Sequence, residues 1–171
     1  LGEFAEAQTI IETIFSKFKL DQPISFAAPL GGIAKLQLFL AQQAYDQVLA
    51  KTDEFLDIAY TLKIRPYLPE ILEFKGRALL GLGEYAQAQT TLNQACLEAE
   101  DLGHYRTRWS IFLTLSQTEA KLDNLTAASH FQNEARNAVQ YIVDRINRPD
   151  LESSFLNLPR VQMVLAEDVS V

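Results

Sequence analysis

The residues of this sequence most able to do chemistry are two histidines and one cysteine, and none has a partner at a useful spacing. His104 and His130 are 26 residues apart, and neither has a Cys, Asp or His four positions away to complete a metal-binding helix face. Cys96 lies between Ala95 and Leu97 in a helix-like stretch, which favours a packed thiol over a reactive one. We therefore expect no metal site and no catalytic residue.

Other catalytic and phosphate-binding patterns are equally weak. Gly31-Gly32 is not followed by the Lys-Ser/Thr of a phosphate-binding loop, and Gly81-Leu-Gly83 belongs to a repeated turn. The order Ser, His, Asp carries no weight without geometry. The neighbouring carboxylates are most simply a solvated helix end. We therefore predict that this segment is not an enzyme and requires no cofactor. The carboxylates in question are Glu98, Glu100 and Asp101.

Composition and charge restrict the partners. With 171 residues, 48% of them hydrophobic, the chain is long and apolar enough for one domain with a core. Its net charge of −7 opposes binding to nucleic acid or to an anionic membrane surface. No apolar run approaches the ~20 residues that span a bilayer. The single cysteine excludes an internal disulfide and fits a reducing cytoplasm, so we predict a cytoplasmic protein.

The sequence repeats itself. Residues 1–9 and 82–90 are identical at seven of nine positions, and the differences are Phe4 against Tyr85 and Glu6 against Gln87. Two weaker copies surround Val48 and Ala128. The aligned small residues stand 41, 40 and 40 positions apart, and apolar or small residues recur three, four and seven positions around them, which traces one face of a helix. The aligned residues are Ala7, Val48, Ala88 and Ala128.

Each repeat is predicted to be a helical hairpin with helix A, a tight turn and helix B. The turn position is occupied by Gly2, Gln43, Gly83 and Asp123. Prolines fall between the expected helices or in their first turns, where a missing N–H costs little. We expect helices at about 3–19 (B), 31–42 (A), 45–62 (B), 68–82 (A), 85–101 (B), 105–122 (A) and 125–147 (B), followed by short helices at 150–157 and 159–166. Residues 20–30 are expected to be irregular and to pack against the core.

These residues resemble the tetratricopeptide repeat (TPR). The third unit carries the family pattern best, and the fourth matches in part. The period of about 40 exceeds the usual 34, and the proline that closes each unit is absent at Glu100. The matching residues of the third unit are Gly76, Leu79, Gly83, Tyr85, Ala88, Leu92 and Ala95.

The longer unit and the tail 145–161 resemble the C-terminal TPR-like region of large multidomain bacterial signalling and regulatory proteins. The resemblance implies an all-α, right-handed superhelical stack of helical hairpins, a TPR-like α-solenoid with short C-terminal capping helices. We expect a single domain over 1–171, with a half repeat at 1–19, units at 31–62, 68–101 and 105–147, and a cap at 150–166. We also expect it to be a fragment of a longer chain, because the first copy lacks its helix A.

The resemblance also implies a binding surface, because helices A line the concave side of such a stack. Residues at one offset before each turn would form a ladder of long polar side chains able to bind an extended peptide, with Arg77 holding a carboxylate. The alternative is an ordinary solvated helix face in which Arg77 pairs with Glu73. The candidate partner-binding residues are Gln37, Glu73, Arg77, Gln117 and Lys121.

Two further features allow two interpretations each. Trp109 is expected to pack between repeats, and the alternative is an exposed anchor for a partner. Arg106 and Arg108, beside His104 and Tyr105, form a local basic spot on an acidic chain, which is either a solvated turn or a site for an acidic partner loop.

We predict that the chain is a protein–protein interaction scaffold, the C-terminal module of a larger regulatory protein, which docks a partner segment on its helix-A surface. One alternative is a module that senses a peptide or small ligand. Another is a homodimerisation module for upstream catalytic domains. We expect the face of Phe4, Ala7, Ile11 and Ile14 to be covered by residues 20–30, by a second copy, or by missing upstream repeats.

Overall fold

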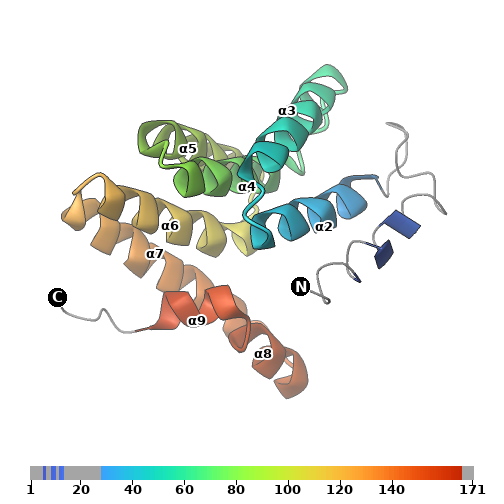
Figure 1. Ribbon diagram of the computed structural model, residues 1–171. Coiled ribbons are helices and arrows are strands. Elements are labelled where there is room, and N and C mark those ends of the chain that lie inside the picture. The colour runs from blue at the N-terminus through green and yellow to red at the C-terminus, as the bar shows by residue number, and fades with distance from the viewer. Residues whose placement is uncertain (1–5, 7–8, 11, 14–27, 167–171) are drawn as a thin grey trace.

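The structure is a computed structural model that describes residues 6, 9–10, 12–13 and 28–166, and its long described segment is all-helical (Figure 1). The helices are α2 (Ala28–Ala41), α3 (Tyr45–Thr61), α4 (Leu68–Leu82), α5 (Tyr85–Asp101), α6 (Tyr105–Lys121), α7 (Leu125–Val143), α8 (Pro149–Leu156) and α9 (Pro159–Leu165). The predicted half repeat 1–19 and the face of Phe4, Ala7, Ile11 and Ile14 lie almost entirely outside the described residues.

The predicted helices between 45 and 122 are confirmed to within one residue at each end. Two predicted bounds are wrong. Helix α2 begins at Ala28, so the end of the segment expected to be irregular is helical. Helix α7 ends at Val143 instead of 147, because backbone N–H groups of Arg145 and Ile146 bond three residues back and tighten the chain before Pro149.

The five turns between α2 and α7 share one backbone geometry. At each turn a single residue adopts a left-handed conformation, and these residues recur every 20 positions. The next N–H donates to the carbonyl five residues earlier, as in the bond from Ala44 N to Phe39 O at 2.9 Å. The half-unit of the fold is therefore 20 residues long. The left-handed residues are Gln43, Lys63, Gly83, Gly103 and Asp123.

From α2 to α7 each helix packs against the next in the sequence, and α4 also contacts α2 and α6. Close approach within the α4–α5 hairpin depends on Gly76, because a Cβ there would lie 2.5 Å from Leu92 Cδ2. Buried polar groups are satisfied: Glu119 accepts hydrogen bonds from Gln89 of α5 at 2.7 Å and from Asn124 of the following turn at 2.9 Å. The result is one continuous stack of hairpins, consistent with a helical repeat.

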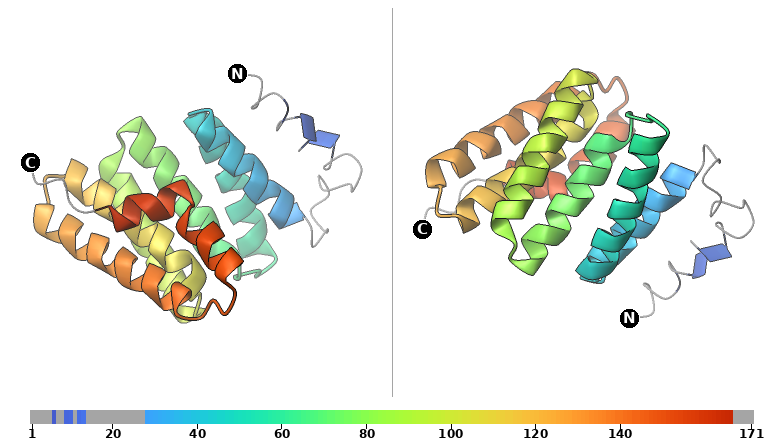
Figure 2. Two further views of the ribbon diagram at one scale, coloured as in Figure 1. Left: turned by 90° about the horizontal axis from the view of Figure 1, so that it is seen from below. Right: turned by 90° about the horizontal axis from the view of Figure 1, so that it is seen from above.

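The last two helices turn back over the stack. Helix α9 contacts α6, α7 and α8, and its Val161 and Val164 are fully buried. Helices α8 and α9 lie in front of α4 and α6 in one view of Figure 2 and behind the stack in the opposite view. They therefore cover one face of α4 and α6. Within the described residues, no helix has the length and apolar character needed to cross a membrane.

Candidate partner-binding face

We call the face formed by α2, α4 and α6, on which α9 lies, the A face. The five residues that the repeat offsets predict as partner-binding belong to these three helices, with Gln37 on α2. Helix α4 supplies Glu73 and Arg77, and α6 supplies Gln117 and Lys121. Between these two helices lies the most extensive polar network of the described chain, and it is centred on Glu73.

Glu73 is bound by a residue of the chain's own C-terminal cap. The guanidinium of Arg160, at the start of α9, donates from Nη1 to Glu73 Oε1 at 2.7 Å. On α6, Ser110 Oγ donates to the same oxygen at 2.8 Å, and Thr114 Oγ1 donates at 3.3 Å. Arg160 Nη2 donates to Thr114 Oγ1 at 2.8 Å and to the carbonyl oxygen of Ser110 at 3.3 Å. One carboxylate therefore joins α4, α6 and α9.

The carboxyl group of Glu73 remains ionised despite its burial. Only 4% of the residue is exposed, and burial alone would raise its pKa. The charges of Arg160 and Arg77, with hydrogen bonds from Arg160 and Ser110, outweigh the burial. The pKa of Glu73 therefore lies below its ordinary value of 4.5. A charged, buried Glu73 whose Oε1 accepts three hydrogen bonds is a specific receptor for one guanidinium.

Aromatic contacts complete the attachment of the cap. Trp109 lies edge-on to Phe155 of α8, with ring centroids 6.0 Å apart, and the guanidinium carbon of Arg160 is 6.0 Å from the Trp109 ring. Trp109 is half-buried and packs against the main core. It therefore packs between the stack and the cap, which is close to the expected packing role between repeats.

The five predicted residues have different surroundings. Glu73 is covered by Arg160, and Arg77 Nη1 lies 3.9 Å from Glu73 Oε2 with 27% of its side chain exposed. Gln117 is half-buried one turn beyond Thr114, while Gln37 on α2 and Lys121 at the end of α6 are exposed. The structure thus brings Glu73 and Arg77 together. It leaves Gln37 and Lys121 at the open surface.

The sequence offset did not identify Arg160, Ser110 or Thr114. Ser110 and Thr114 are spaced by one helical turn on α6, so a polar pair on one face was visible in principle. Arg160 had no such signal, because it stands 87 residues from Glu73 and outside the repeated units. A contact of this kind depends on how the cap folds back.

In the described part of the chain, no three His, Cys, Asp or Glu side chains form a group able to hold a metal. Burial raises the pKa of the Cys96 thiol to about 11, so this thiol is poorly nucleophilic. Of the carboxylates expected to be solvated, Glu98 and Asp101 accept hydrogen bonds from Arg65 Nη2 at 2.8 and 2.7 Å. They join the α3–α4 turn to α5.

The fold and this face define an all-α protein of consecutive helical hairpins that holds its own C-terminal helix on one side. Comparison with known proteins finds no family model, no curated protein and no solved structure that matches the chain.

Proposed function

We propose that this chain is a TPR-like solenoid that docks a segment of a partner protein on its A face. The observation that best supports docking is the seat of α9, where a short helix is held on the A face by Arg160 and Glu73, 2.7 Å apart. A surface that binds one helix of its own chain through buried polar bonds has the chemistry needed to bind a partner segment. In this proposal the stack is a right-handed superhelix and the A face is its concave side.

The repeated backbone geometry supports the solenoid. Left-handed residues at a constant 20-residue interval end successive helices in the same way, from Gln43 to Asp123. Identical turns rotate successive helices by similar angles, which is how a stack acquires a regular curvature. The contacts of α4 with both α2 and α6 place helices of the same kind side by side.

The open part of the A face is the proposed docking surface. Gln37 and Lys121 are exposed, and Gln117 is half-buried. Arg77 is partly exposed, and its helix α4 comes between α2 and α6 along the chain. Arg160 occupies Oε1 of Glu73, and Arg77 lies 3.9 Å from Oε2, beyond hydrogen-bond distance. The donors of Arg77 are therefore able to bind a partner's carboxylate or backbone carbonyl groups.

This proposal assigns no chemical step to the segment. The surface acts by holding a partner in place, as the interaction module of a larger regulatory protein in the cytoplasm. Such a role needs a preformed surface, and the buried network around Glu73 holds α4 and α6 in a fixed relationship.

The test compares two double variants by affinity purification with quantitative mass spectrometry. Gln37→Glu/Lys121→Glu changes the exposed ends of the A face, and Gln47→Glu/Lys63→Glu makes the same charge change at exposed positions on α3 and the α3–α4 turn. Arg77→Glu is less suitable, because a second carboxylate near buried Glu73 would disturb the cap. Circular dichroism and thermal melting confirm that both variants fold.

We expect proteins captured by the wild-type chain to be lost with Gln37→Glu/Lys121→Glu and retained with the control. Equal capture by both variants would reject the A face as the docking surface.

A further inference from the structure

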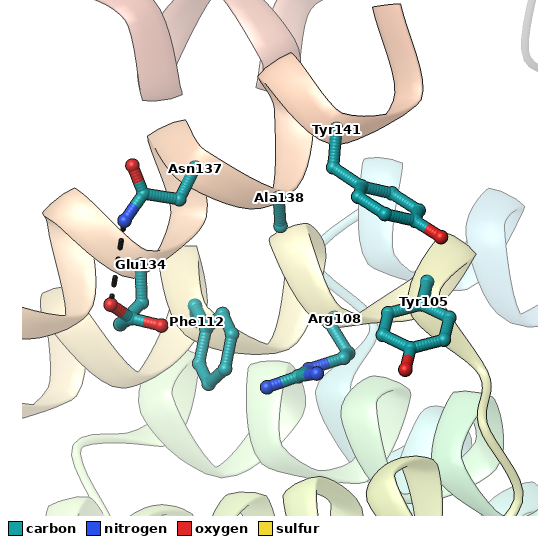
Figure 3. A pocket seen from close by; sticks show the side chains of 7 residues that line it. All are labelled: Tyr105, Arg108, Phe112, Glu134, Asn137, Ala138 and Tyr141. Carbon is teal, nitrogen blue, oxygen red and sulfur yellow. Dashed lines mark hydrogen bonds between the residues drawn. The ribbon is translucent and has the colours of Figure 1, made fainter. Parts of the chain in front are cut away.

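A second surface lies at the open end of the α6–α7 hairpin, away from the turn at Asp123. There a cavity of about 170 Å³ opens between the start of α6 and the end of α7. This volume suits one side chain and excludes a large ligand. In Figure 3 the side chains from both helices surround the opening. They are Tyr105, Arg108 and Phe112 of α6, with Glu134, Asn137, Ala138 and Tyr141 of α7. We call it the Tyr105–Tyr141 pocket.

This pocket is separate from the A face. Ser110 and Thr114 of α6 contact Glu73 on the A face. Arg108 precedes Ser110 by two residues, which places it about 200° around the helix. Tyr105 and Phe112 lie three and four residues from Arg108 and so share its side of α6. The two surfaces are therefore on opposite sides of one helix, and each can be altered without touching the other.

The pocket holds a guanidinium that has no carboxylate partner among the described residues. Arg108 lies over two rings, with its guanidinium carbon 5.3 Å from the Phe112 centroid and 5.6 Å from the Tyr105 centroid. Within the described residues it forms no ion pair and no side-chain hydrogen bond. Contacts with ring faces orient a guanidinium but leave its charge and its N–H donors available. Arg108 is therefore ready to receive an anionic group.

A second guanidinium lies at the edge of the same pocket. Arg145 stacks on Tyr141, with its guanidinium carbon 3.5 Å from the ring centroid, and donates to the carbonyl oxygen of Tyr141 at 3.0 Å. Among the described side chains it too has no carboxylate within ion-pair distance. Each of the two tyrosines therefore has a guanidinium against its ring, Arg108 at Tyr105 and Arg145 at Tyr141.

The two tyrosines form an exposed aromatic wall. Their ring centroids are 5.1 Å apart, and 50% of Tyr105 and 37% of Tyr141 are exposed. Exposed tyrosine and arginine around a small pocket are the residue types that dominate binding energy at protein interfaces. The wall offers a flat, apolar side for the aliphatic part of a bound side chain.

One acidic residue opposes this charge. Glu134 lines the pocket and accepts a long hydrogen bond of 3.5 Å from Asn137 Nδ2. The lining itself carries one guanidinium and one carboxylate, and Arg145 beside Tyr141 adds a positive charge next to it, on a chain whose net charge is −7. A local positive charge on a negative protein selects a ligand with local negative charge. It disfavours a long polyanion such as nucleic acid, which would also meet the surrounding negative surface.

We propose that the Tyr105–Tyr141 pocket binds a carboxylate side chain of an acidic segment of a partner protein. Arg108 receives the carboxylate through paired N–H donors, Arg145 adds charge at the rim, and the tyrosine rings cover the aliphatic part of the bound side chain. This site extends the proposed function, because it provides a second and independent contact on the opposite side of α6.

The test uses the 171-residue chain and a capped peptide of six glutamates, with a capped peptide of six glutamines as the uncharged match. Chemical shifts of the Arg108 Nε–H group and of the Tyr105 and Tyr141 amides report binding at the pocket. We expect the glutamate peptide to shift these signals and the glutamine peptide to leave them unchanged.

Four variants make the site falsifiable. Arg108→Gln should weaken binding of the glutamate peptide by at least about tenfold, because it removes a charged hydrogen-bond donor. Glu134→Gln should strengthen binding several-fold, a gain that a purely structural role would not give. Lys121→Gln removes the same charge thirteen residues further along α6, about 20 Å away, and should change nothing. Arg145→Gln tests the pocket at the exposed rim should Arg108→Gln fail to fold.

Three results would overturn the proposal. The first is equal binding of the glutamate peptide by wild type, Arg108→Gln and Arg145→Gln. The second is loss of binding with Lys121→Gln, which would assign the peptide to the A face. The third is equal binding of a capped glutamine peptide or of a six-residue oligothymidine, which would remove the selectivity for an acidic peptide. The partner capture that tests the A face is measured independently, so either surface can fail alone.

Discussion

Arg160 Nη1 lies 2.7 Å from Glu73 Oε1, and this contact joins the C-terminal cap to a helix 87 residues earlier in the chain. Glu73 is 5% and Arg160 23% exposed at the side chain, so the pair is largely removed from water. A buried carboxylate is costly without its partner, and the cap is therefore needed for α4 and α6 to keep their arrangement.

Removing the guanidinium should release the cap. Arg160→Ala leaves buried Glu73 without its main partner, so we expect a loss of about 3 kcal/mol in the free energy of unfolding. Hydrogen exchange of α8 and α9 should rise, and Trp109 fluorescence should shift to the red as Arg160 and Phe155 leave its ring. Urea unfolding followed at Trp109 measures the loss.

Two companion variants identify the cause. Arg148→Ala removes an exposed pair with Asp150 in the same segment and should leave the free energy of unfolding nearly unchanged. Glu73→Leu/Arg160→Met replaces both charges and should recover much of the loss, because no buried charge is left unpaired. Equal hydrogen exchange of α8 and α9 in wild type and Arg160→Ala would contradict the role of Arg160 in holding the cap.

The same pair predicts a response to acid. Because the pKa of Glu73 is lowered in the folded protein, the ionised group stabilises the fold above its ordinary value of 4.5. This contribution is lost as the pH falls below 4.5 and through the lower folded value. Stability measured by urea unfolding at pH 7 and pH 3 should fall more in wild type than in Glu73→Gln. Parallel pH profiles for the two proteins would show that Glu73 does not carry this dependence.

The left-handed turn residues predict that substitution by glycine increases the stability of the protein. Lys63 has φ = 54° and Asp123 has φ = 60°, and a side chain in this region is strained where glycine is not. Lys63→Gly should therefore raise the free energy of unfolding by about 0.5–1 kcal/mol, and Gly83→Ala should lower it by about 1 kcal/mol. Urea unfolding measures both.

A control substitution inside a helix separates the effect of the turn conformation from the general effect of introducing a glycine. Ala50 is exposed within α3, where Ala50→Gly should cost about 1 kcal/mol. A loss of stability in Lys63→Gly as large as that in Ala50→Gly would show that the turn conformation contributes nothing.

The burial of Cys96 predicts a thiol that reacts slowly. Burial raises the pKa of Cys96 to about 11 from 9.0, and the nearby charge of Arg108 partly opposes this rise. Because the pKa is higher by about 2, the folded protein carries about 100-fold less thiolate at pH 8. Ellman's reagent should therefore react far more slowly with the folded than with the urea-unfolded protein. Arg108→Gln removes the opposing charge and should slow the reaction further. Equal rates in folded and unfolded protein would contradict the burial of this thiol.

The helices could be predicted from the sequence because their signals are local. Gly83 ends α4 in a left-handed conformation, and Pro69 lies in the first turn of the same helix. The turns at Gln43 and Lys63 carried no glycine, so the uniform 20-residue geometry was hidden and only the 40-residue period was visible. The early start of α2 was equally hidden, since Pro29 also suits the first turn of a helix.

The residues of the candidate site also divide into those that the sequence predicted and those that it did not. Regular spacing along α2, α4 and α6 predicted Gln37, Glu73, Arg77, Gln117 and Lys121 as one face, and the structure brings Glu73 and Arg77 of this set together. The spacing was not enough to predict that Arg160 covers Glu73. It also did not separate Arg106 from Arg108: the first lines a cavity with Tyr67 and Glu70, and the second lines the Tyr105–Tyr141 pocket.

The sequence by itself determined most elements of this protein: the seven matches in its nine-residue repeated string, the period of 40 and the helix bounds between 45 and 122 follow from neighbours along the chain. Only the tertiary structure decided what the faces of those helices contact. Periodicity states which side of a helix a residue occupies, but not which distant segment reaches it. The folding back of α9 and the opposite placement of the A face and the Tyr105–Tyr141 pocket depend on that long-range packing.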